Sequence, residues 1–493
     1  MEVSTDLGTT ELGTTKFVTM QSQPQNTIDL SCLDNIKGAI HFAGIGGIGM
    51  SALARILLHR GYKVSGSDKH ASAITDELKA LGAHIFVGHN AENMHDAGAL
   101  IISTAIVEGN PELDSARSKG LPVYHRSDLL NYLAKGEKLI SVTGTHGKTT
   151  TTAMVGQVLM SCGFDPSIVV GGVFDHIGAN SRNGAGGFFV AESDESDGTH
   201  VKAHSFASII TNIEPDHLEN YPGGFQDILT SMVKFVQNTA DFCVVCTDDS
   251  GVKKLLPMLK EVKTRLVSYG KYDAKAPADY SFETLSGFEM MIYKGAKQLG
   301  KVSLKVPGDH NKYNITAAIA IAMELSGDFE HAATAAAQFG GVDRRFQIIG
   351  EVNNILVVDD YAHHPTEVAA LLNAAREFVK NERGGKGRIV CVFQPHQPGR
   401  LKDLWQEFRV CFDQADIAYI GDIYIARGGK IPGIDTPTFV KEVTNNHTHY
   451  LPGTASEMAT NLLPLLQKDD LVLTVGAGDI TTVGPALVNL LKK

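Results

Sequence analysis

The chain has few cysteines, no long apolar run and no excess of positive charge. Its six cysteines are scattered through 493 residues, which excludes the disulfide framework of a small secreted module and makes a reducing cytosol the expected setting. The most apolar stretch, 39–58, is interrupted by His41, Arg55 and glycines, so it does not predict a membrane span. The first residues lack a basic segment followed by an apolar one, so no secretory signal is expected.

The balance of charge is acidic, with 55 acidic against 44 basic residues and a formal net charge of −11. Without a global positive field, neither nucleic acid nor an anionic membrane is an expected partner, and any anion must be held by a focused site. Hydrophobic residues make up 43% of the chain and charged residues 20%, as in ordinary globular proteins. We therefore expect a folded, soluble protein of about three domains.

Short apolar runs alternate with helical patterns along most of the chain, a rhythm typical of parallel α/β sheets. Residues 1–35 show little of it and are interpreted as a flexible leader without an assigned role. The rhythm begins near residue 36 and restarts near 138 and 354. We therefore predict three α/β domains at 36–136, 137–343 and 344–493.

The first glycine loop, 44–49, lies between a predicted strand and a predicted helix. Gly44, Gly46, Gly47 and Gly49 satisfy G-x-G-x-x-G, and Asp68 ends the next predicted strand. Glycines let backbone N–H groups approach a pyrophosphate at a helix N-terminus, so the loop predicts a diphosphate nucleotide. By spacing alone the pattern fits NAD, and a plain turn for tight strand–helix packing is the other interpretation.

A second glycine-rich loop, the phosphate loop 144–149, follows another predicted strand and opens a helix predicted over Thr150–Ser161. Its sequence is Gly-Thr-His-Gly-Lys-Thr. Such a loop wraps phosphates with its N–H groups, while Lys148 places a cation on the β and γ oxygens and the Thr149 hydroxyl binds Mg²⁺. The loop departs from G-x-x-x-x-G-K-[ST] because residue 142 is valine, but its strand–loop–helix context still predicts a nucleotide-phosphate site.

Polar side chains gather at the predicted carboxyl ends of further strands, where open α/β sheets place their ligands. Glu192 follows one strand, and Asn212, Asp216 and His217 follow another. A strand-end carboxylate fits Mg²⁺ beside phosphates, although acidic runs are usually solvated loops. Asn311 and Asn314 share one face of a predicted helix; they can contact adenine or phosphate, or simply cap the helix.

Charged and aromatic groups continue into the third predicted domain. Arg344 and Arg345 stand at the junction, where they can reach a transferring phosphate or form an interdomain salt bridge. Asp360, Tyr361, His363 and His364 follow one strand, and His396 and Arg400 follow another. Two adjacent histidines can bind zinc, but neither a cysteine nor a spaced third ligand accompanies them in the sequence. Substrate contacts are therefore the favoured interpretation.

Taken together, these motifs resemble the ATP-dependent Mur ligases of peptidoglycan synthesis. The resemblance covers nearly all of 38–493 and rests on HFAGIGGIGMSALA, GTHGKTTTT, AESDESD, TNIEPDH, PGDHNKYN, GVDRRF, DDYAHHPTE and FQPH, which occur in family order. It implies a Rossmann-like UDP-substrate domain, a central P-loop ATPase domain and a Rossmann-like C-terminal domain for the amino acid. The implied reaction joins L-alanine to the carboxylate of UDP-N-acetylmuramate through an acyl phosphate, with ATP and Mg²⁺ as cofactors.

The resemblance also assigns roles to residues. It implies that Lys148 stabilises the migrating γ-phosphoryl group, that Asn311 lies near adenine and that Asp360 lies near the ribose. The implied catalytic residues are Lys148, His217, Arg345, His363, His364 and Arg400. The implied ATP-binding residues are Gly144, Thr145, His146, Gly147, Lys148, Thr149, Thr150, Asn311, Arg345 and Asp360. The implied Mg²⁺ ligands are Thr149, Glu192 and His217. The implied UDP-sugar contacts are Gly44, Gly46, Gly47, Gly49, Asp68, Ser103 and Arg126, and the implied amino-acid contacts are Tyr361, His363 and His396.

The sequence also departs from the family and leaves alternatives open. Gln397 stands after FQPH where an arginine is usual, which removes one cation near the reacting centre. A ligase that recycles a tripeptide onto the same nucleotide sugar, a P-loop ATPase and an NAD-dependent dehydrogenase are the competing interpretations. For the ligase we expect small-molecule substrates, no nucleic-acid or membrane partner, a monomer or homodimer, and a cytoplasmic location.

Overall fold

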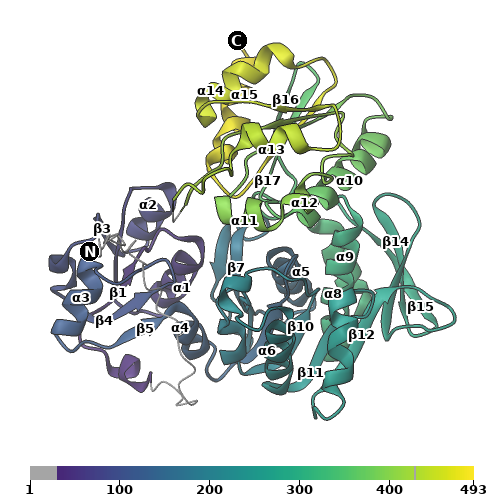
Figure 1. Cartoon of the computed structure of the whole chain (residues 1–493). Coiled ribbons are helices and arrows are strands. Elements are labelled where there is room, and N and C mark those ends of the chain that lie inside the picture. Colours follow the sequence, from purple (N-terminus) through teal and green to yellow (C-terminus); the bar gives the residue numbers. More distant parts are fainter. Residues whose placement is uncertain (1–29, 427–428) are drawn as a thin grey trace, which may run out of the picture.

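The computed structural model describes residues 30–426 and 429–493, and three sheets follow one another along the chain (Figure 1). Most of the predicted leader, 1–29, lies outside the described residues. Its last part forms a short 3₁₀ helix at Ser31–Asn35. Within it, Leu33 is fully buried in the core beneath the first sheet. Regular structure is therefore already present in 31–35, before residue 36, where the sequence predicted the first domain to start.

The first sheet is parallel and has the order β3-β2-β1-β4-β5. Its strands are β1 (Ala39–Ala43), β2 (Val64–Asp68), β3 (His84–Val87), β4 (Ala97–Ile102) and β5 (Val123–His125), and its helices are α1 (Ile48–His59), α2 (Ala73–Ala80), α3 (Pro111–Ser118) and α4 (Arg126–Leu133). Helix α1 forms because Leu53, Ile56 and Leu57 recur at helical spacing and are buried. The strand order reverses at β1, so the first glycine loop lies where such sheets bind ligands.

The second sheet has ten strands in the order β15-β14-β13-β12-β11-β10-β6-β9-β7-β8. They are β6 (Lys138–Thr143), β7 (Ser167–Phe174), β8 (Ala179–Arg182), β9 (Phe188–Glu192), β10 (Ser205–Ile210), β11 (Thr239–Cys246), β12 (Arg265–Lys271), β13 (Tyr280–Thr284), β14 (Glu289–Lys294) and β15 (Lys297–Ser303). The helices are α5 (Lys148–Ser161), α6 (Phe225–Gln237), α7 (Ser250–Leu255), α8 (Asp309–Leu325) and α9 (Phe329–Gln338). Strand β6 pairs in parallel with β9 and β10, so the loops after all three open at one edge.

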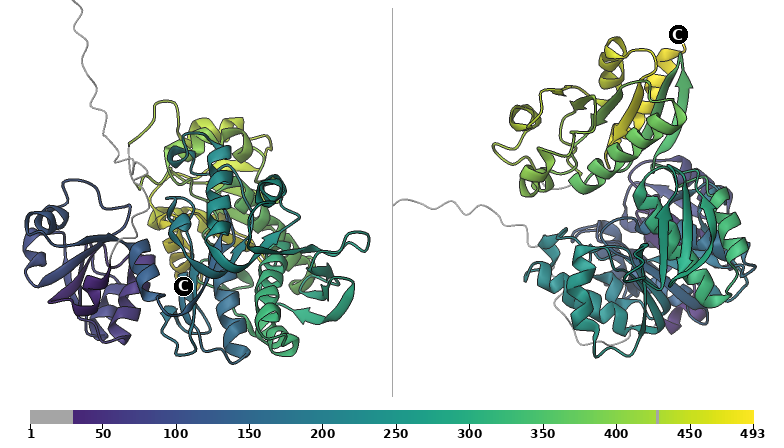
Figure 2. Two further views of the ribbon diagram at one scale, coloured as in Figure 1. Left: turned by 90° about the horizontal axis from the view of Figure 1, so that it is seen from below. Right: turned by 90° about the vertical axis from the view of Figure 1, so that its right-hand side faces the viewer.

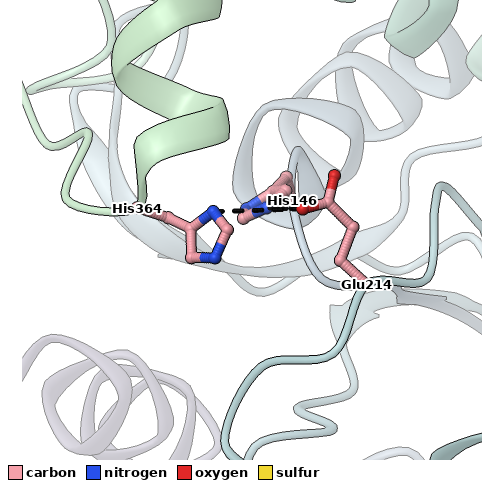
Figure 3. Close-up of side chains that lie close together, drawn as sticks. All are labelled: His146, Glu214 and His364. Atoms are coloured by element: carbon pink, nitrogen blue, oxygen red, sulfur yellow. Dashed lines mark ion pairs between the residues drawn. The ribbon is translucent and has the colours of Figure 1, made fainter. Parts of the chain in front are cut away.

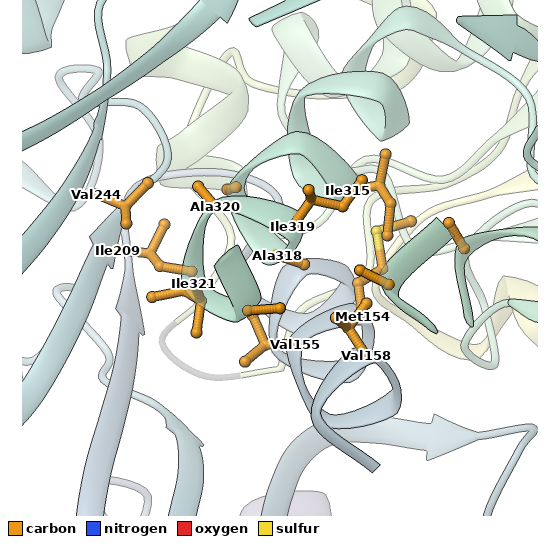
Figure 4. Packing of buried hydrophobic residues seen from close by; sticks show 14 of the residues in the cluster. Met154, Val155, Val158, Ile209, Val244, Ile315, Ala318, Ile319, Ala320 and Ile321 are labelled. Atoms are coloured by element: carbon orange, nitrogen blue, oxygen red, sulfur yellow. The ribbon is translucent and has the colours of Figure 1, made fainter. Parts of the chain in front are cut away.

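Helices α5 and α8 pack closely against each other beside this sheet (Figure 4). Val155 and Val158 of α5 meet the Ile315–Ala322 part of α8, where alanines alternate with isoleucines and every side chain is fully buried. Small alanine side chains let two helices approach while isoleucines fill the remaining space. Because α5 starts at the phosphate loop and α8 starts at the Asn311 segment, this packing fixes both relative to each other.

The third sheet has the order β16-β17-β21-β18-β19-β20 and is parallel except for β16 at its edge. Its strands are β16 (Gln347–Val352), β17 (Ile355–Asp360), β18 (Ile389–Phe393), β19 (Ile417–Ile420), β20 (Thr448–Tyr450) and β21 (Leu471–Val475). Its helices are α10 (Pro365–Glu382), α11 (Pro398–Asp403), α12 (Trp405–Phe408), α13 (Thr436–Glu442), α14 (Ala455–Leu462) and α15 (Val483–Leu491). The predicted α/β class with three sheet-bearing domains is confirmed.

The three parts are joined unequally. The first and second sheets share one core cluster, in which Leu129 and Leu133 of α4 belong with Phe189 of β9. The third part forms a separate lobe above them (Figure 2) with core clusters of its own. None of the helices in 30–426 and 429–493 is long and apolar enough to cross a membrane.

Candidate active site

The conformation of the phosphate loop depends on two glycines, Gly144 and Gly147, that no other residue can replace without strain. Gly144 and Gly147 have φ values of +131° and +81°, a region that side chains rarely adopt. A Cβ on Gly144 would lie 2.2 Å from Thr211 Oγ1, and one on Gly147 would lie 2.9 Å from Asn314 Oδ1. Helix α5 begins at Lys148 without a side-chain cap, so its first N–H groups and its dipole are available to a phosphate anion.

Lys148 lies among carboxylates at the mouth of this loop. Its Nζ donates to the carbonyl oxygens of Gly144 (2.8 Å) and Thr145 (3.2 Å) and pairs with Glu195 at 2.9 Å. Although burial opposes the charge, Glu195 and Asp194 raise the pKa of Lys148 above its usual range. Lys148 therefore stays cationic at any working pH, as stabilising a transferring phosphoryl group requires.

Thr149 and Glu192 together provide the oxygen ligands of a hard cation. The Thr149 hydroxyl donates to Glu192 Oε2 at 3.3 Å, and the backbone N–H of Gly171 on β7 donates to the other carboxylate oxygen. Burial raises the pKa of Glu192, a cost that a bound cation would remove. The donor set of hydroxyl and carboxylate fits Mg²⁺ beside phosphates. His217 lies farther along the loop after β10, beside Asp216.

Ion pairs connect the acidic segment after β9 with Arg126 at the start of α4, beside the first glycine loop. Arg126 binds Asp194 at 3.0 Å and Asp197 at 3.4 Å, and its guanidinium lies 3.3 Å from where a Cβ of Gly49 would be. Burial opposes the charge of Asp194, but Lys148 and Arg126 lower its pKa to about 2. The structure therefore brings Arg126 and Gly49 together, and Asp194 is a charged neighbour of both Arg126 and Lys148.

The remaining residues predicted for the first glycine loop have different roles. Asp68 accepts the backbone N–H of Gly46 at 3.0 Å, so its carboxylate already stabilises the loop from within. A Cβ on Gly46 would lie 2.8 Å from that carboxylate, which explains the glycine. Ser103 follows β4, where its carbonyl accepts the N–H of Ile106 at 3.0 Å. Asp68, at the end of β2, therefore stabilises the loop, and its contact with the UDP group stays a prediction.

A cavity of about 330 Å³ lies between the second sheet and the third lobe. Asn311, Asn314, Arg345 and Asp360 all line it. The resemblance implies ATP contacts for Asn311, Arg345 and Asp360, and these roles stay predictions. The capping interpretation of the two asparagines does not hold, because α8 has Gly308 at its N-cap and no side-chain cap. Asn314 instead donates to Asn311 Oδ1 at 3.3 Å.

The two adjacent arginines at the junction of the second and third parts make different contacts. Arg344 adopts φ of +61° and binds buried Asp359 of β17 at 3.2 Å, which is a salt bridge within the third lobe and not the interdomain one considered from the sequence. Arg345 lines the cavity and lies with its guanidinium carbon 5.3 Å from the ring centre of Tyr361. Arg345 is therefore the arginine that faces the cavity.

Asp360 is buried at the cavity wall, and burial raises its pKa to about 6. Its oxygens accept the N–H groups of Phe346 (2.7 Å) and Ala362 (2.8 Å). A carboxyl whose folded pKa is raised stabilises the fold below its unfolded pKa and loses that contribution as pH rises through the folded value. From pH 4 to pH 7 this loss amounts to about 3 kcal/mol.

We therefore predict that Asp360→Asn removes part of the pH dependence of stability. The asparagine amide fits the two N–H groups less well than the carboxyl does, but this cost in stability is the same at every pH. A pH-dependent difference in melting temperature between the two proteins therefore reports the titration of Asp360. The melting temperature of Asp360→Asn should rise relative to the parent between pH 4 and pH 7, measured by scanning calorimetry. Parallel melting curves over that range would contradict the raised pKa.

Histidines of the third lobe face the loop after β10. His363 Nδ1 lies 2.9 Å from the carbonyl oxygen of Tyr361, and its ring lies 6.0 Å from that of His396. Burial lowers the pKa of His363 to about 3, so the ring is neutral and can accept a hydrogen bond through Nε2. Arg400 on α11 approaches His396 (3.5 Å) and Asp216 (4.0 Å). The residues predicted for the amino acid thus gather at one place, and Gln397 adopts φ of +73° beside them.

His146 of the phosphate loop meets two carboxylates and a histidine. Its Nδ1 lies 3.1 Å from Glu367 and its Nε2 lies 3.5 Å from Glu214. Although burial opposes the charge, these two carboxylates raise the pKa of His146 to about 9. The ring of His364 lies 4.9 Å away. His146 and Glu367 therefore join the phosphate loop to the N-terminus of α10.

Sequence reasoning did not select Glu195, Glu214 or Glu367. Glu367 occupies the third position of α10 and completes a capping box with His364. Its place in the sequence therefore indicates only a helix start and gives no sign of its contact with His146. Glu195 and Glu214 stand within acidic or loop segments, where carboxylates are usually solvated. Their partners Lys148 and His146 are distant in sequence, and only the fold brings them together.

Comparison with known proteins gives a consistent result along the chain. Residues 39–138 match the Mur ligase family catalytic domain, 142–322 the Mur ligase middle domain, and 344–478 the Mur ligase glutamate ligase domain. The UDP-N-acetylmuramate–L-alanine ligase of Trichlorobacter lovleyi is 40% identical over 92% of this chain and 98% of its own length.

Solved structures agree with this comparison. The UDP-N-acetylmuramate–alanine ligase of Thermotoga maritima is 31% identical, with a TM-score of 0.77 over 92% of this chain and 99% of its own. A murein peptide ligase of Psychrobacter arcticus, 21% identical, shares the fold with a TM-score of 0.68 over 92% of this chain and 98% of its own.

Proposed function

This chain belongs to the Mur ligase family, and we propose that it joins L-alanine to the carboxylate of UDP-N-acetylmuramate at the expense of ATP, in peptidoglycan synthesis. The observation that carries the proposal is 40% identity, over nearly the full length of both chains, to a ligase of that name. A phosphate loop with a buried, cationic Lys148 supplies the matching chemistry. An NAD-dependent dehydrogenase would have no use for such a loop.

The reaction proceeds in two transfers. The muramoyl carboxylate attacks the γ-phosphorus of ATP, the bond to the bridging oxygen breaks, and ADP leaves an acyl phosphate. The amine of L-alanine then attacks the acyl carbon, inorganic phosphate departs with the bonding electrons, and the amine gives up a proton. Both steps develop negative charge on phosphoryl oxygens, where cations and N–H donors act most strongly.

ATP binds along the phosphate loop and in the neighbouring cavity. Phosphates lie against the N-terminus of α5 with Lys148 on the transferring group, and the nucleoside occupies the cavity lined by Asn311, Arg345 and Asp360. Thr149 and Glu192 are the proposed Mg²⁺ ligands, with His217 as a further candidate. Mg²⁺, when bound, neutralises charge on the phosphates.

The other two substrates approach from opposite sides. The first glycine loop holds the UDP group, and Arg126 at the start of α4 lies beside its Gly49. Arg126 and Lys148 share Asp194 as a charged neighbour, and the muramoyl carboxylate binds between these two cations. Neutral His363 accepts a hydrogen bond from the amine of the amino acid, and Arg400 attracts its carboxylate or the acyl phosphate. The domain boundaries near 136 and 343, the cytoplasmic location and the choice between monomer and homodimer stay predictions.

Phosphate release from ATP and Mg²⁺ with UDP-N-acetylmuramate tests the proposal. We expect release that depends on L-alanine and a matching gain in mass on the nucleotide sugar. Release that depends instead on the recycled tripeptide would move the chain to the recycling branch of the family. Release independent of both the sugar nucleotide and the amino acid would indicate a P-loop ATPase of another kind.

A further inference from the structure

Three potential metal ligands converge where the second and third parts of the molecule meet (Figure 3). His146 comes from the phosphate loop, Glu214 from the loop after β10, and His364 from the N-cap of α10. One ligand atom of each lies within 4.8 Å of those of the other two. The sequence offered no third ligand for His363 and His364 because the companions of His364 are distant in the chain.

The spacing of these atoms suits a small tetrahedral ion. Glu214 Oε2 lies 3.5 Å from His146 Nε2 and 3.9 Å from His364 Nδ1. His364 Nδ1 also accepts the Thr366 N–H at 3.3 Å, a hydrogen bond that an ion bound at this nitrogen would replace. Ligand atoms around tetrahedral zinc lie about 3.3 Å apart, given metal–ligand distances of about 2.0 to 2.1 Å. The two pairs with Glu214 therefore have to close by about 0.2 and 0.6 Å. The ligand atoms of His146 and His364 lie within 4.8 Å of each other, and an adjustment of side-chain torsions brings them closer.

The surroundings orient the first histidine as a ligand. His146 Nδ1 faces Glu367 at 3.1 Å, and Glu367 accepts the backbone N–H groups of His363 and His364 at its other oxygen. A carboxylate behind the far nitrogen of a histidine is the usual outer support of a zinc ligand, because it fixes ring and tautomer. His146 Nε2 is buried and faces Glu214 Oε2 at 3.5 Å, and a bound ion would take the place of the proton on this nitrogen.

We propose that His146, Glu214 and His364 form an inhibitory site for a zinc-class divalent cation, separate from the Mg²⁺ site at Thr149 and Glu192. Two imidazoles and one carboxylate favour zinc and its neighbours over magnesium, which prefers oxygen ligands. One ligand belongs to the phosphate loop and one to the third lobe, so a bound ion ties the lobe to the loop. Turnover requires the phosphate loop and the third lobe to rearrange around the substrates. An ion that holds them together therefore inhibits the reaction. Only the inhibition rests on the proposed function; binding does not.

Cobalt(II) titration of the full chain, without nucleotide and with excess Mg²⁺, tests the site directly. We expect one equivalent to give the visible absorption of tetrahedral nitrogen and oxygen ligation, and zinc to displace it. Glu214→Gln and His146→Ala should each weaken binding at least tenfold. His89→Ala is the matched control, because His89 lies 2.9 Å from buried Glu112 outside this cluster. Equal loss in the control, or undiminished binding in Glu214→Gln, would overturn the site.

A second measurement separates this proposal from the proposed function. If the chain ligates L-alanine, micromolar zinc should inhibit it and a chelator should restore it, and Glu214→Gln should need at least tenfold more zinc for the same fractional inhibition. Cobalt binding at the three residues without zinc inhibition would overturn the inhibitory role alone. A failure of ligation under every condition would overturn the proposed function and leave the binding result standing.

Discussion

Replacing Lys148 by alanine is expected to lower ligation by about 10³-fold or more, because the cation that neutralises the transferring phosphoryl group is lost. Lys148 is the group best placed for this task, at the mouth of the phosphate loop and next to the N-terminus of α5. Its carboxylate neighbours keep its pKa high. Single-turnover phosphate release and mass analysis of the nucleotide sugar measure the loss.

The same substitution has a cost in stability that must be separated from the loss of catalysis. Lys148→Ala leaves Glu195, only 7% exposed, without its ion pair, and breaking such a pair costs about 3 kcal/mol. Burial already raises the pKa of Glu195, so a proton can take the place of the lost partner. We therefore expect a lower melting temperature but a folded protein.

Lys202→Ala is the matched control for Lys148→Ala. Lys202 binds Asp128 at 3.0 Å, and that carboxylate is also 7% exposed, so the control leaves an equally buried carboxylate without its ion pair, away from the phosphate loop. It should lower the melting temperature to a similar extent and keep most of the activity. Ligation by Lys148→Ala within tenfold of the parent would refute the assigned role of Lys148.

Much of the fold could be predicted from local patterns. The strand at Ala39–Ala43, the helix at Ile48–His59 and the restart at Lys138–Thr143 follow from apolar runs, helical spacing and glycine-rich loops. The phosphate loop was predictable because its residues are adjacent in sequence. The antiparallel strands at 280–303 were not predicted, because the expected rhythm of strand and helix has no place for a meander at the sheet edge.

Site residues could be predicted only where all the interacting residues lie within one sequence motif. Lys148 and Thr149 stand side by side, so their chemistry is visible in the sequence. The pairing of His146 with Glu367 joins residues 221 positions apart, and no local pattern encodes it. Asp68 makes a contact that its spacing did not indicate: its carboxylate accepts the Gly46 N–H, while the nucleotide contact stays a prediction.

The magnesium site can be damaged without removing any ligand, through Gly171. This residue has ordinary backbone angles and donates its N–H to Glu192. A Cβ there would lie 2.8 and 3.0 Å from the two carboxylate oxygens of Glu192 and 3.1 Å from Thr149 Oγ1. The atoms it meets are the ends of side chains that can move, so the fold tolerates the methyl group while the ligands are displaced.

We predict that Gly171→Ala raises the Mg²⁺ concentration for half-maximal ligation by about 10- to 100-fold, the usual effect of disturbing the support of a metal ligand. Because the defect lies in metal binding, excess Mg²⁺ should restore most of the rate, and the melting temperature should change little. Gly163→Ala is the control: its methyl group meets nothing within 4 Å, and any cost of its φ of +81° falls on stability. An unchanged Mg²⁺ dependence in Gly171→Ala would show that Glu192 does not hold the ion. A rate loss that Mg²⁺ cannot rescue would instead mean that the methyl group disturbs the phosphate loop through Thr149.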